Sequence, residues 1–229
     1  MKMLIIIPAY NEEKNLEKTI EDITKNAVEF DYVIVNDGST DGTLELCRKN
    51  HYNYLNLPVN LGIGGAVQTG YRYAYYHGYD LVVQFDGDGQ HCAEFLGTMK
   101  DTLVKTESDM VIGSRFIVKE GFQSSALRRI GIKYFSMLIK ILTGTRITDP
   151  TSGIRMINRN LLEIFVEDYP KDYPEPESVV TALSKKYKVI EIPVLMNERE
   201  NGVSSISLKN GFYYMIKVTF AILIARMKK

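Results

Sequence analysis

The stretch LVVQFDGDGQH, residues 81–91, runs from an apolar segment directly into two carboxylates. The segment shows no alternation of apolar and polar residues, which predicts a strand buried on both faces, as in a parallel sheet. That strand would deliver Asp86 and Asp88 to its carboxyl end. Four uses of such a pair come into question: a divalent metal, a phosphorylated aspartate, calcium, or only a turn.

The residues after the carboxylates narrow these uses. A calcium-binding EF-hand loop needs glycine where His91 stands and glutamate where Gly97 stands, so it is excluded. Phosphatases that form an aspartyl phosphate usually have threonine or valine at the place of Gln90, so they fit less well. Asp86, Asp88 and Gln90 alternate, so their side chains can share one side of an extended segment and hold a hard cation. A solvated turn stays open as the alternative.

The rest of the first half repeats this strand-and-helix pattern. Strands are predicted at residues 3–8, 31–36, 52–58, 79–85 and 109–115, with helices between them. Such alternation predicts an α/β fold with a parallel, doubly wound sheet over about the first 115 residues, and these sheets bind ligands at the carboxyl ends of their strands. The polar residues expected at those ends are Tyr10, Asn11, Glu12, Asp37, Asp86, Asp88, Ser114 and Arg115. Their convergence on one edge predicts a ligand site there.

Two glycine-containing segments accompany these strand ends. NLGIGGAVQTG, residues 60–70, is no dinucleotide fingerprint, because Val67 stands where that motif needs glycine. Gly64 is expected to let the main chain turn close to a bound nucleotide, with a purely structural turn as the alternative. The turn NDGSTDG, residues 36–42, places Asp37 nearest to its strand. A carboxylate there can accept hydrogen bonds from a nucleotide base or ribose.

Composition excludes several classes of protein. Of the 229 residues 45% are hydrophobic, which is too many for a disordered chain and enough for a sizeable core. Lys+Arg and Asp+Glu both number 28, so a net charge of zero gives no overall nucleic-acid footprint. Cys47 and Cys92 form no CxxC pair, which argues against a zinc site or disulfides and fits the cytosol. The N-terminus is no signal peptide, because Pro8 and acidic residues end its apolar run.

Two helices of the second half are both apolar and basic. They are predicted at residues 127–143 and 207–226. The second contains an apolar run, residues 211–225. At ~1.5 Å per residue that run is about 22 Å long, short of a ~30 Å hydrocarbon core. Both helices are therefore expected to lie in the membrane interface, with basic residues at anionic headgroups. A buried helix or a contact in a homo-oligomer is the alternative.

Six motifs occur in order at these positions: PAYNEE, VNDGSTDGT, NLGIGGA, FDGDGQH, GSRF and DPTSGIR. Together they resemble the family 2 glycosyltransferases of fold type A, and among them the synthases of dolichyl- or polyprenyl-phosphate sugars. The resemblance covers nearly the whole chain. It implies one Rossmann-like domain over residues 1–229 with a mostly parallel central sheet. Residues 1–115 would bind the nucleotide sugar, and residues 116–229, with the two interfacial helices, would bind the acceptor.

The resemblance implies a donor site at the strand ends. Four residues match the segments that bind the nucleotide: Pro8, Tyr10, Glu12 and Asp37. Three match metal ligands for Mg²⁺ or Mn²⁺, the first also contacting the diphosphate: Asp86, Asp88 and Gln90. Arg115 matches an arginine near the phosphates. The chain departs from the family where Asn36 replaces a common aspartate and Ile63 a frequent lysine.

The nature of the acceptor decides which residues of the second half matter. A phosphate, with a second pKa near ~6, arrives as an anionic nucleophile and needs no base. It needs cations, for which arginines are well suited. The candidates are Arg128, Arg129, Arg155 and Arg199, and the resemblance places one of the first two at the acceptor phosphate. A hydroxyl acceptor would need a base, for which the candidates are Asp149, Glu175 and Glu177. The phosphate is favoured.

The expected activity follows from these residues, with Asp88, Arg115 and Asp149 as candidate catalytic groups. It is a metal-dependent, inverting transfer of a hexose from a nucleotide diphosphate sugar to a polyprenyl phosphate such as undecaprenyl phosphate, for cell-envelope polysaccharide. A UDP-sugar such as UDP-glucose is favoured over a GDP-sugar. The expected place is the cytosolic face of the cell membrane, with peripheral attachment. The rivals are transfer to a sugar hydroxyl of a growing polysaccharide and an inactive nucleotide-sugar-binding protein.

Overall fold

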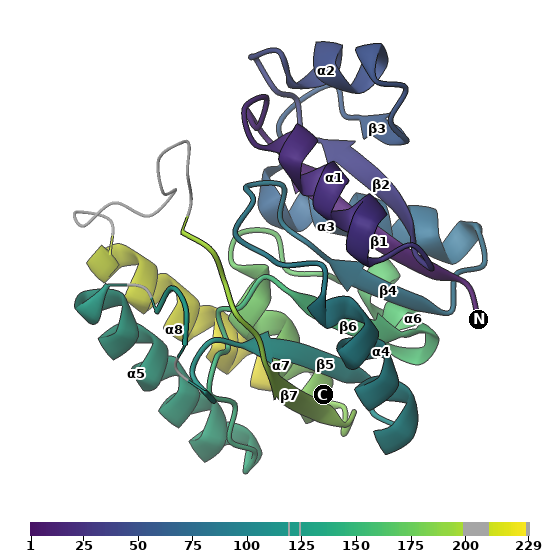
Figure 1. Cartoon of the computed structure of the whole chain (residues 1–229). Coiled ribbons are helices and arrows are strands. Elements are labelled where there is room, and N and C mark those ends of the chain that lie inside the picture. Colours follow the sequence, from purple (N-terminus) through teal and green to yellow (C-terminus); the bar gives the residue numbers. More distant parts are fainter. Residues whose placement is uncertain (119, 124, 199–210, 228–229) are drawn as a thin grey trace.

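The structure, a computed structural model, describes residues 1–118, 120–123, 125–198 and 211–227. Its strands are β1 (Met3–Ala9), β2 (Asp31–Asn36), β3 (Tyr54–Asn56), β4 (Leu81–Gln84), β5 (Met110–Ser114), β6 (Arg155–Asn158) and β7 (Val189–Pro193). Its helices are α1 (Leu16–Asn26), α2 (Thr43–Lys49), α3 (Gly62–Tyr76), α4 (Phe95–Thr106), α5 (Ala126–Thr143), α6 (Arg159–Glu167), α7 (Pro174–Ser184) and α8 (Gly211–Met227). Within the described residues, seven strands form one sheet in the order β3-β2-β1-β4-β6-β5-β7 (Figure 1).

Helices cover both faces of this sheet (Figure 1). Alternate side chains of a strand point to opposite faces. In β1, Ile5 and Ile7 pack in one core with α1 and α4, whereas Leu4 and Ile6 pack in the other with α3, α6 and α7. All four are fully buried. Cover by helices on both faces explains why β1 is apolar throughout and β4 is apolar up to Gln84, and it confirms the predicted α/β fold.

Strand β6 is the exception to the parallel order. It runs antiparallel between β4 and β5, and its first residue, Arg155, lies opposite both Gln84 and Ile112. Because β6 runs in reverse, the loop before it, residues 149–154, reaches the edge where β4 and β5 end. The sheet is mostly parallel, as predicted, and the reversed strand brings a segment of the second half to the expected ligand-binding edge.

Two segments that follow strands have a distinct local structure. Helix α3 already begins at Gly62, so Gly64 lies inside a helix rather than in a loop. Asn11 has a φ of 58°, and its side-chain Oδ1 accepts the N–H of Thr40 at 2.8 Å and that of Asp41 at 3.3 Å. This side chain joins the turn after β1 to the turn after β2.

The two apolar helices of the second half lie side by side beyond α7 (Figure 1). One side of α8 packs into the core through Val218 and Ile222, both fully buried. None of the described helices is both long and apolar enough to cross a bilayer. Residues 207–210 of the predicted second helix lie outside the described residues.

Candidate active site

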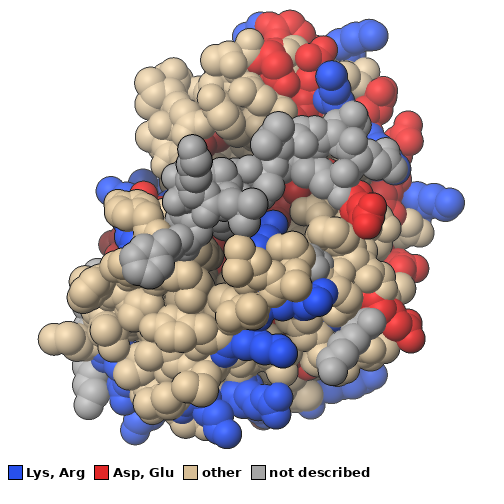
Figure 2. All heavy atoms as spheres, turned by 90° about the vertical axis from the view of Figure 1, so that its left-hand side faces the viewer, with Lys and Arg blue, Asp and Glu red and all other residues tan. Residues whose placement is uncertain are grey.

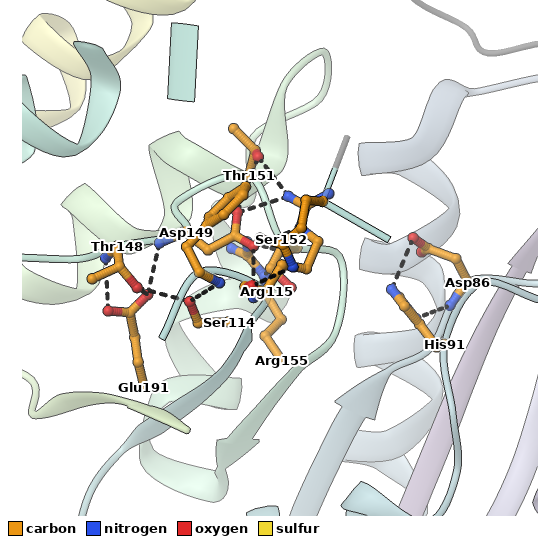
Figure 3. A network of polar contacts seen from close by, with 12 residues as sticks. Asp86, His91, Ser114, Arg115, Thr148, Asp149, Thr151, Ser152, Arg155 and Glu191 are labelled. Carbon is orange, nitrogen blue, oxygen red and sulfur yellow. Dashed lines mark hydrogen bonds and ion pairs between the residues drawn. The ribbon is translucent and has the colours of Figure 1, made fainter. Parts of the chain in front are cut away.

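Asp86 follows β4, and its neighbours fix its orientation. Gln84 donates its side-chain N–H to Asp86 Oδ1 at 3.1 Å. The Asp86 main-chain N–H donates to His91 Nδ1 at 3.0 Å, which places the proton of a neutral imidazole on Nε2. That nitrogen lies 3.6 Å from Asp86 Oδ2 (Figure 3). The carboxylate is thus held in place by the protein itself.

The loop before β6 contacts the same carboxylate. Gly153 approaches Asp86 so closely that a Cβ atom on residue 153 would overlap Asp86 Oδ2. A residue without a side chain is therefore required for this loop to pack on Asp86. The motifs FDGDGQH and DPTSGIR, far apart in the sequence, form one site.

Asp88 and Gln90 complete a set of oxygen donors. Asp88 Oδ1 accepts the Gln90 main-chain N–H at 3.1 Å, and Gln90 Nε2 lies 3.4 Å from the Asn197 carbonyl oxygen, which leaves Gln90 Oε1 for a ligand. The described residues contain no group of three or more histidine, cysteine, aspartate or glutamate side chains that could hold a metal on their own. Two carboxylates and an amide fit Mg²⁺ or Mn²⁺ when phosphate oxygens supply further ligands.

Arg115 follows β5 and forms a bidentate ion pair with Asp149. Its Nε donates to Asp149 Oδ2 and its Nη2 to Asp149 Oδ1, both at 2.7 Å (Figure 3). Nη2 also donates to Thr151 Oγ1 at 3.0 Å. Asp149 is fully buried and both of its oxygens accept from Arg115, so it orients the guanidinium and does not fit the role of a base. The contacts of the described residues leave Arg115 Nη1 for a phosphate.

The residues expected at the nucleotide differ in exposure. Tyr10 is 48% exposed, whereas Pro8 is buried within β1. Glu12 is buried too, and its Oε2 accepts from the Asn15 side-chain amide at 2.7 Å. Tyr10 is therefore the member of this segment whose side chain is open to a ligand.

Asp37 is buried at the end of β2. Its Oδ1 accepts the Leu61 N–H at 2.7 Å. Burial raises the pKa of Asp37 above its ordinary value, against the opposing effect of the Leu61 and Gly62 N–H groups. The carboxylate ties the turn after β2 to the start of α3, at the same edge of the sheet as the strand ends that carry Asp86 and Arg115.

A known protein family accounts for this arrangement of strand ends. Residues 4–165 match the model described as Glycosyl transferase family 2. The chain belongs to this family. It is therefore a glycosyltransferase, and the resemblance that the six motifs predicted is confirmed.

Relatives match the glycosyltransferase over most of its length. The polyprenol monophosphomannose synthase of Mycolicibacterium smegmatis is 30% identical over 227 residues, covering 95% of this chain and 85% of that protein. The undecaprenyl-phosphate mannosyltransferase of Micrococcus luteus is 30% identical, covering 90% and 88%. The UDP-N-acetylglucosamine–dolichyl-phosphate N-acetylglucosaminyltransferase of Methanococcus voltae is 28% identical, covering 98% and 96%.

A solved structure supports the fold of the glycosyltransferase. The crystal structure of glucosyl-3-phosphoglycerate synthase from Mycobacterium tuberculosis, in complex with phosphoglyceric acid, superposes with a TM-score of 0.75. It covers 98% of this chain and 79% of that one at 17% sequence identity. At this identity the likeness extends to the fold alone.

Gly64 of the glycosyltransferase is explained by packing within the protein. A Cβ atom on residue 64 would overlap the carbonyl oxygens of Pro170 and Lys171, and the Gly64 N–H donates to Lys171 O at 3.1 Å. These contacts explain the glycine without a ligand, and its place beside the nucleotide stays a prediction. This glycine joins α3 to the loop before α7.

Arg155 of the glycosyltransferase does not reach the acceptor side. It is fully buried, and its guanidinium donates to the carbonyl oxygens of Ser152 and Glu175 and to Ser178 Oγ. These partners fix it between β6 and the start of α7. The expectation that Arg155 binds the acceptor is corrected, because a phosphate would have to displace these interior contacts.

The remaining arginines expected at the acceptor differ in position. Arg128 and Arg129 are exposed in the first turn of α5. Arg199 lies outside the described residues. Of these arginines, Arg128 and Arg129 at the start of α5 stay predictions for acceptor binding.

Two polar strand residues that the sequence analysis missed support the site. Gln84 is fully buried beside Asp86, and the half-buried Glu191 on β7 accepts the main-chain N–H groups of Thr148 and Asp149. Both belong to strands that are otherwise apolar, LVVQ and VIEIP. A polar residue within such a run is a usable signal, because its burial requires a hydrogen-bonding partner.

Proposed function

We propose that this chain transfers a hexose from a UDP-sugar, such as UDP-glucose, to a polyprenyl phosphate such as undecaprenyl phosphate, for cell-envelope polysaccharide. The M. smegmatis and M. luteus relatives support the acceptor class, since they are named for polyprenol and undecaprenyl phosphate. The M. voltae relative is named for a UDP-sugar, which supports UDP over GDP. Residues 1–115 serve the donor and residues 116–229 the acceptor.

The observation that carries this proposal is the pair of Arg115 and Asp149. A phosphate acceptor needs a fixed cation and no base, whereas a hydroxyl needs a base. Both carboxylate oxygens of Asp149 accept hydrogen bonds from Arg115, at 2.7 Å each. The pair therefore offers a ligand the guanidinium cation and not a carboxylate base. Arg115 Nη1 then binds an oxygen of the donor diphosphate, and the exposed Arg128 and Arg129 orient the acceptor phosphate.

Metal dependence fits the oxygen donors at the end of β4. Bound to Asp86, Asp88 and Gln90, Mg²⁺ or Mn²⁺ would neutralise the charge that develops on the leaving diphosphate. The chain holds these donors ready: Gln84 and His91 fix Asp86, and the main chain of residue 90 fixes Asp88. Attack by the acceptor from the opposite face of the sugar inverts the anomeric carbon.

Helices α5 and α8 present an apolar face that we assign to the membrane. Exposed apolar residues recur on α5 with helical spacing: Leu127, Ile130, Tyr134, Met137 and Ile141. On α8 they are Tyr213, Ile216, Phe220, Ile224 and Met227. Figure 2 shows a broad uncharged area on this side of the molecule, with lysines and arginines along its lower border. An exposed patch of this kind is typical of a contact with a membrane or another protein.

Contacts between the two helices and their charges favour a lipid surface. The Tyr134 hydroxyl lies 3.1 Å from Thr219 Oγ1, and Arg226 Nε donates to Leu142 O at 2.8 Å, so the helices form one unit. Neither helix contains an acidic residue. The basic residues of α5 are Arg128, Arg129, Lys133 and Lys140. An apolar face with a basic border suits peripheral attachment to anionic lipid, here on the cytosolic side.

Incubation with a series of nucleotide sugars tests the reaction. We expect release of nucleotide and formation of a sugar-linked lipid only when undecaprenyl phosphate and Mg²⁺ or Mn²⁺ are present. UDP-glucose is expected to react faster than a GDP-sugar. Transfer to an oligosaccharide, with no lipid product from any donor, would contradict the proposed acceptor.

Sedimentation with vesicles that contain phosphatidylglycerol tests the membrane face. Ile130→Ser combined with Phe220→Ser is expected to lower the bound fraction about tenfold or more, since two apolar side chains leave the bilayer. Val28→Ser, at an apolar residue that is 82% exposed elsewhere, is the matched control. Unchanged binding would contradict the membrane assignment, and a dimer that the double variant dissociates would point to a homo-oligomer instead.

One feature favours the second candidate, transfer to a sugar hydroxyl. Glu175 lies in the first turn of α7. Burial raises the pKa of its carboxyl, Arg155 lowers it and Asp86 raises it further. A carboxyl with a raised pKa near such a site is suited to proton transfer. Glu175→Gln separates the candidates: transfer to a lipid phosphate is expected to persist, whereas transfer to a hydroxyl would be lost.

A further inference from the structure

Glu191 lies on β7, and its carboxylate faces the loop before β6 (Figure 3). Its Oε2 accepts the Thr148 N–H at 2.7 Å. Its Oε1 accepts the Asp149 N–H at 2.8 Å and the Thr148 hydroxyl at 3.0 Å. All three donors belong to one dipeptide, Thr148–Asp149, so this carboxylate fixes the main chain of the loop at that point.

The same dipeptide holds Arg115 on its other side. The Asp149 carboxylate accepts from Arg115 Nε and Nη2 at 2.7 Å each and from the Arg115 main-chain N–H at 3.2 Å. Ser114, the residue before Arg115, has its Oγ 2.7 Å from Thr148 Oγ1. Glu191 is thus connected to the guanidinium of Arg115 through Thr148 and Asp149.

A carboxylate suits this place better than an amide would. Three donors converge on its two oxygens, and hydrogen bonds to a charged acceptor are stronger than those to a neutral one. Glutamine would keep one acceptor oxygen and turn an NH₂ group toward an N–H, so at least one of the three bonds would be lost. Burial raises the pKa of Glu191 and the nearby Asp149 adds to the rise, while the three donors lower it.

We propose that Glu191 is a positioning residue for Arg115, acting through Thr148 and Asp149. The inference rests on the proposed function, in which Arg115 binds phosphate. Loosening the dipeptide would let Asp149 and the guanidinium shift together, and a misplacement of ~1 Å can slow a reaction about 100-fold. The loss falls on kcat more than on the donor KM, because an aligned cation matters most where charge develops.

A double-mutant cycle with Glu191→Gln and Arg115→Lys tests this connection. Glu191→Gln alone is expected to lower kcat about tenfold. In the Arg115→Lys background, Glu191→Gln is expected to lower kcat little further. Lysine has no guanidinium, so the group that Glu191→Gln would misalign is already absent. An equal loss in both backgrounds would overturn the proposal, since Glu191 would then act independently of Arg115.

Asp109→Asn is the matched control for the cycle. Asp109 precedes β5, and its Oδ2 accepts the Lys188 N–H at 2.8 Å. It therefore also joins a carboxylate to a main-chain N–H, at the opposite end of the same pair of strands. Asp109→Asn is expected to leave kcat unchanged in both backgrounds. A loss of kcat as large as that of Glu191→Gln would overturn the assignment to Glu191.

A second variant keeps the test valid if Glu191→Gln does not fold. Thr148→Val removes the hydroxyl donor and leaves both main-chain bonds, so a smaller loss of kcat is expected, again only where Arg115 is present. The native protein is assayed first. If it transfers no sugar from any donor, the proposed function fails. If it is active and the variants of Glu191 and Thr148 combine additively with Arg115→Lys, only the role of Glu191 fails.

Discussion

The two halves of the chain place their charged side chains in different ways. In the proposed donor half, residues 1–115, Asp37 and Asp86 stand within two residues of the ends of β2 and β4. Asp37 accepts a hydrogen bond from the Leu61 N–H, and Asp86 accepts one from the Gln84 side chain. In the proposed acceptor half, residues 116–229, Arg155 turns into the interior, whereas Arg128 faces solvent on α5. The difference shows that a short carboxylate stays where its strand ends, while a long arginine is placed by whatever partners surround it.

The largest expected effect is in the donor half, at Asp88. Asp88→Asn is expected to lower kcat about 1000-fold, because removal of one group that stabilises developing charge typically lowers the rate by ~10²–10³. The measurement is the initial rate of nucleotide release with saturating donor and Mg²⁺ or Mn²⁺. A kcat that stays near that of the native protein would contradict the metal role of this strand end.

Asp80 provides the matched control for Asp88. It precedes the same strand, β4, at the opposite edge of the sheet, where its Oδ2 accepts the Lys2 N–H at 2.7 Å. Asp80→Asn is expected to leave kcat within about twofold of the native value. Equal losses at both ends of β4 would show that the carboxyl edge has no special role.

Much of the donor half could be predicted because its signals are local. The run LVVQ predicts a buried strand, and Asp86 and Asp88 follow it within a few residues, so the sequence also predicts carboxylates at the strand end. The same holds for β1 and β2. Parallel strands then bring these ends to one edge whatever their order in the sheet, so the donor site needed no knowledge of the pairing.

The rest depends on partners that are distant in the sequence. Nothing in RMIN tells that β6 runs antiparallel between β4 and β5, because strand order is set by pairing between remote segments. Arg155 has the same residue type as Arg128, but the carbonyl oxygens of Ser152 and Glu175 and the hydroxyl of Ser178 bind it in the interior. In the sequence Gly64 resembles a ligand-binding glycine, and its close contact with the main chain of Lys171 becomes evident only in the structure.

Substitution of Arg155 is expected to have the next largest effect. It tests whether this arginine stabilises the interior or binds the acceptor. Arg155→Met is expected to lower the free energy of unfolding by about 3 kcal/mol. The reason is that the carbonyl oxygens of Ser152 and Glu175 and the hydroxyl of Ser178 lose their hydrogen-bond donor in the interior. The measurement is urea unfolding. Arg128→Met is the control, and it is expected to leave stability unchanged while weakening use of the lipid phosphate. The reverse outcome would restore Arg155 to the acceptor site.

Gly64 tests the contact between α3 and the loop before α7. Gly64→Ala is expected to lower the free energy of unfolding by about 2 kcal/mol, since a methyl group would meet the carbonyl oxygens of Pro170 and Lys171. Gly97→Ala, inside α4 with open space around it, is the control and is expected to be neutral or stabilising. If Gly64→Ala folds normally but binds the nucleotide sugar weakly, Gly64 belongs to the donor site after all.

The smallest expected effect is a pH dependence at Asp37. Burial raises the pKa of this carboxyl in the folded protein. The folded chain then binds more protons than the unfolded chain between the two pKa values. The stabilising contribution of Asp37 is therefore complete below the unfolded pKa, about 3.9, and is lost as the pH rises through the folded pKa.

Asp37→Asn removes this titration while keeping an oxygen that can accept the Leu61 N–H. The free energy of unfolding of the variant, relative to the native protein, is expected to increase between about pH 4 and about pH 7. The measurement is urea unfolding across that range, with Asp101→Asn, an exposed carboxylate on α4, as the control. A difference between Asp37→Asn and the native protein that does not vary with pH would show that burial does not shift the titration of the carboxyl at the end of β2.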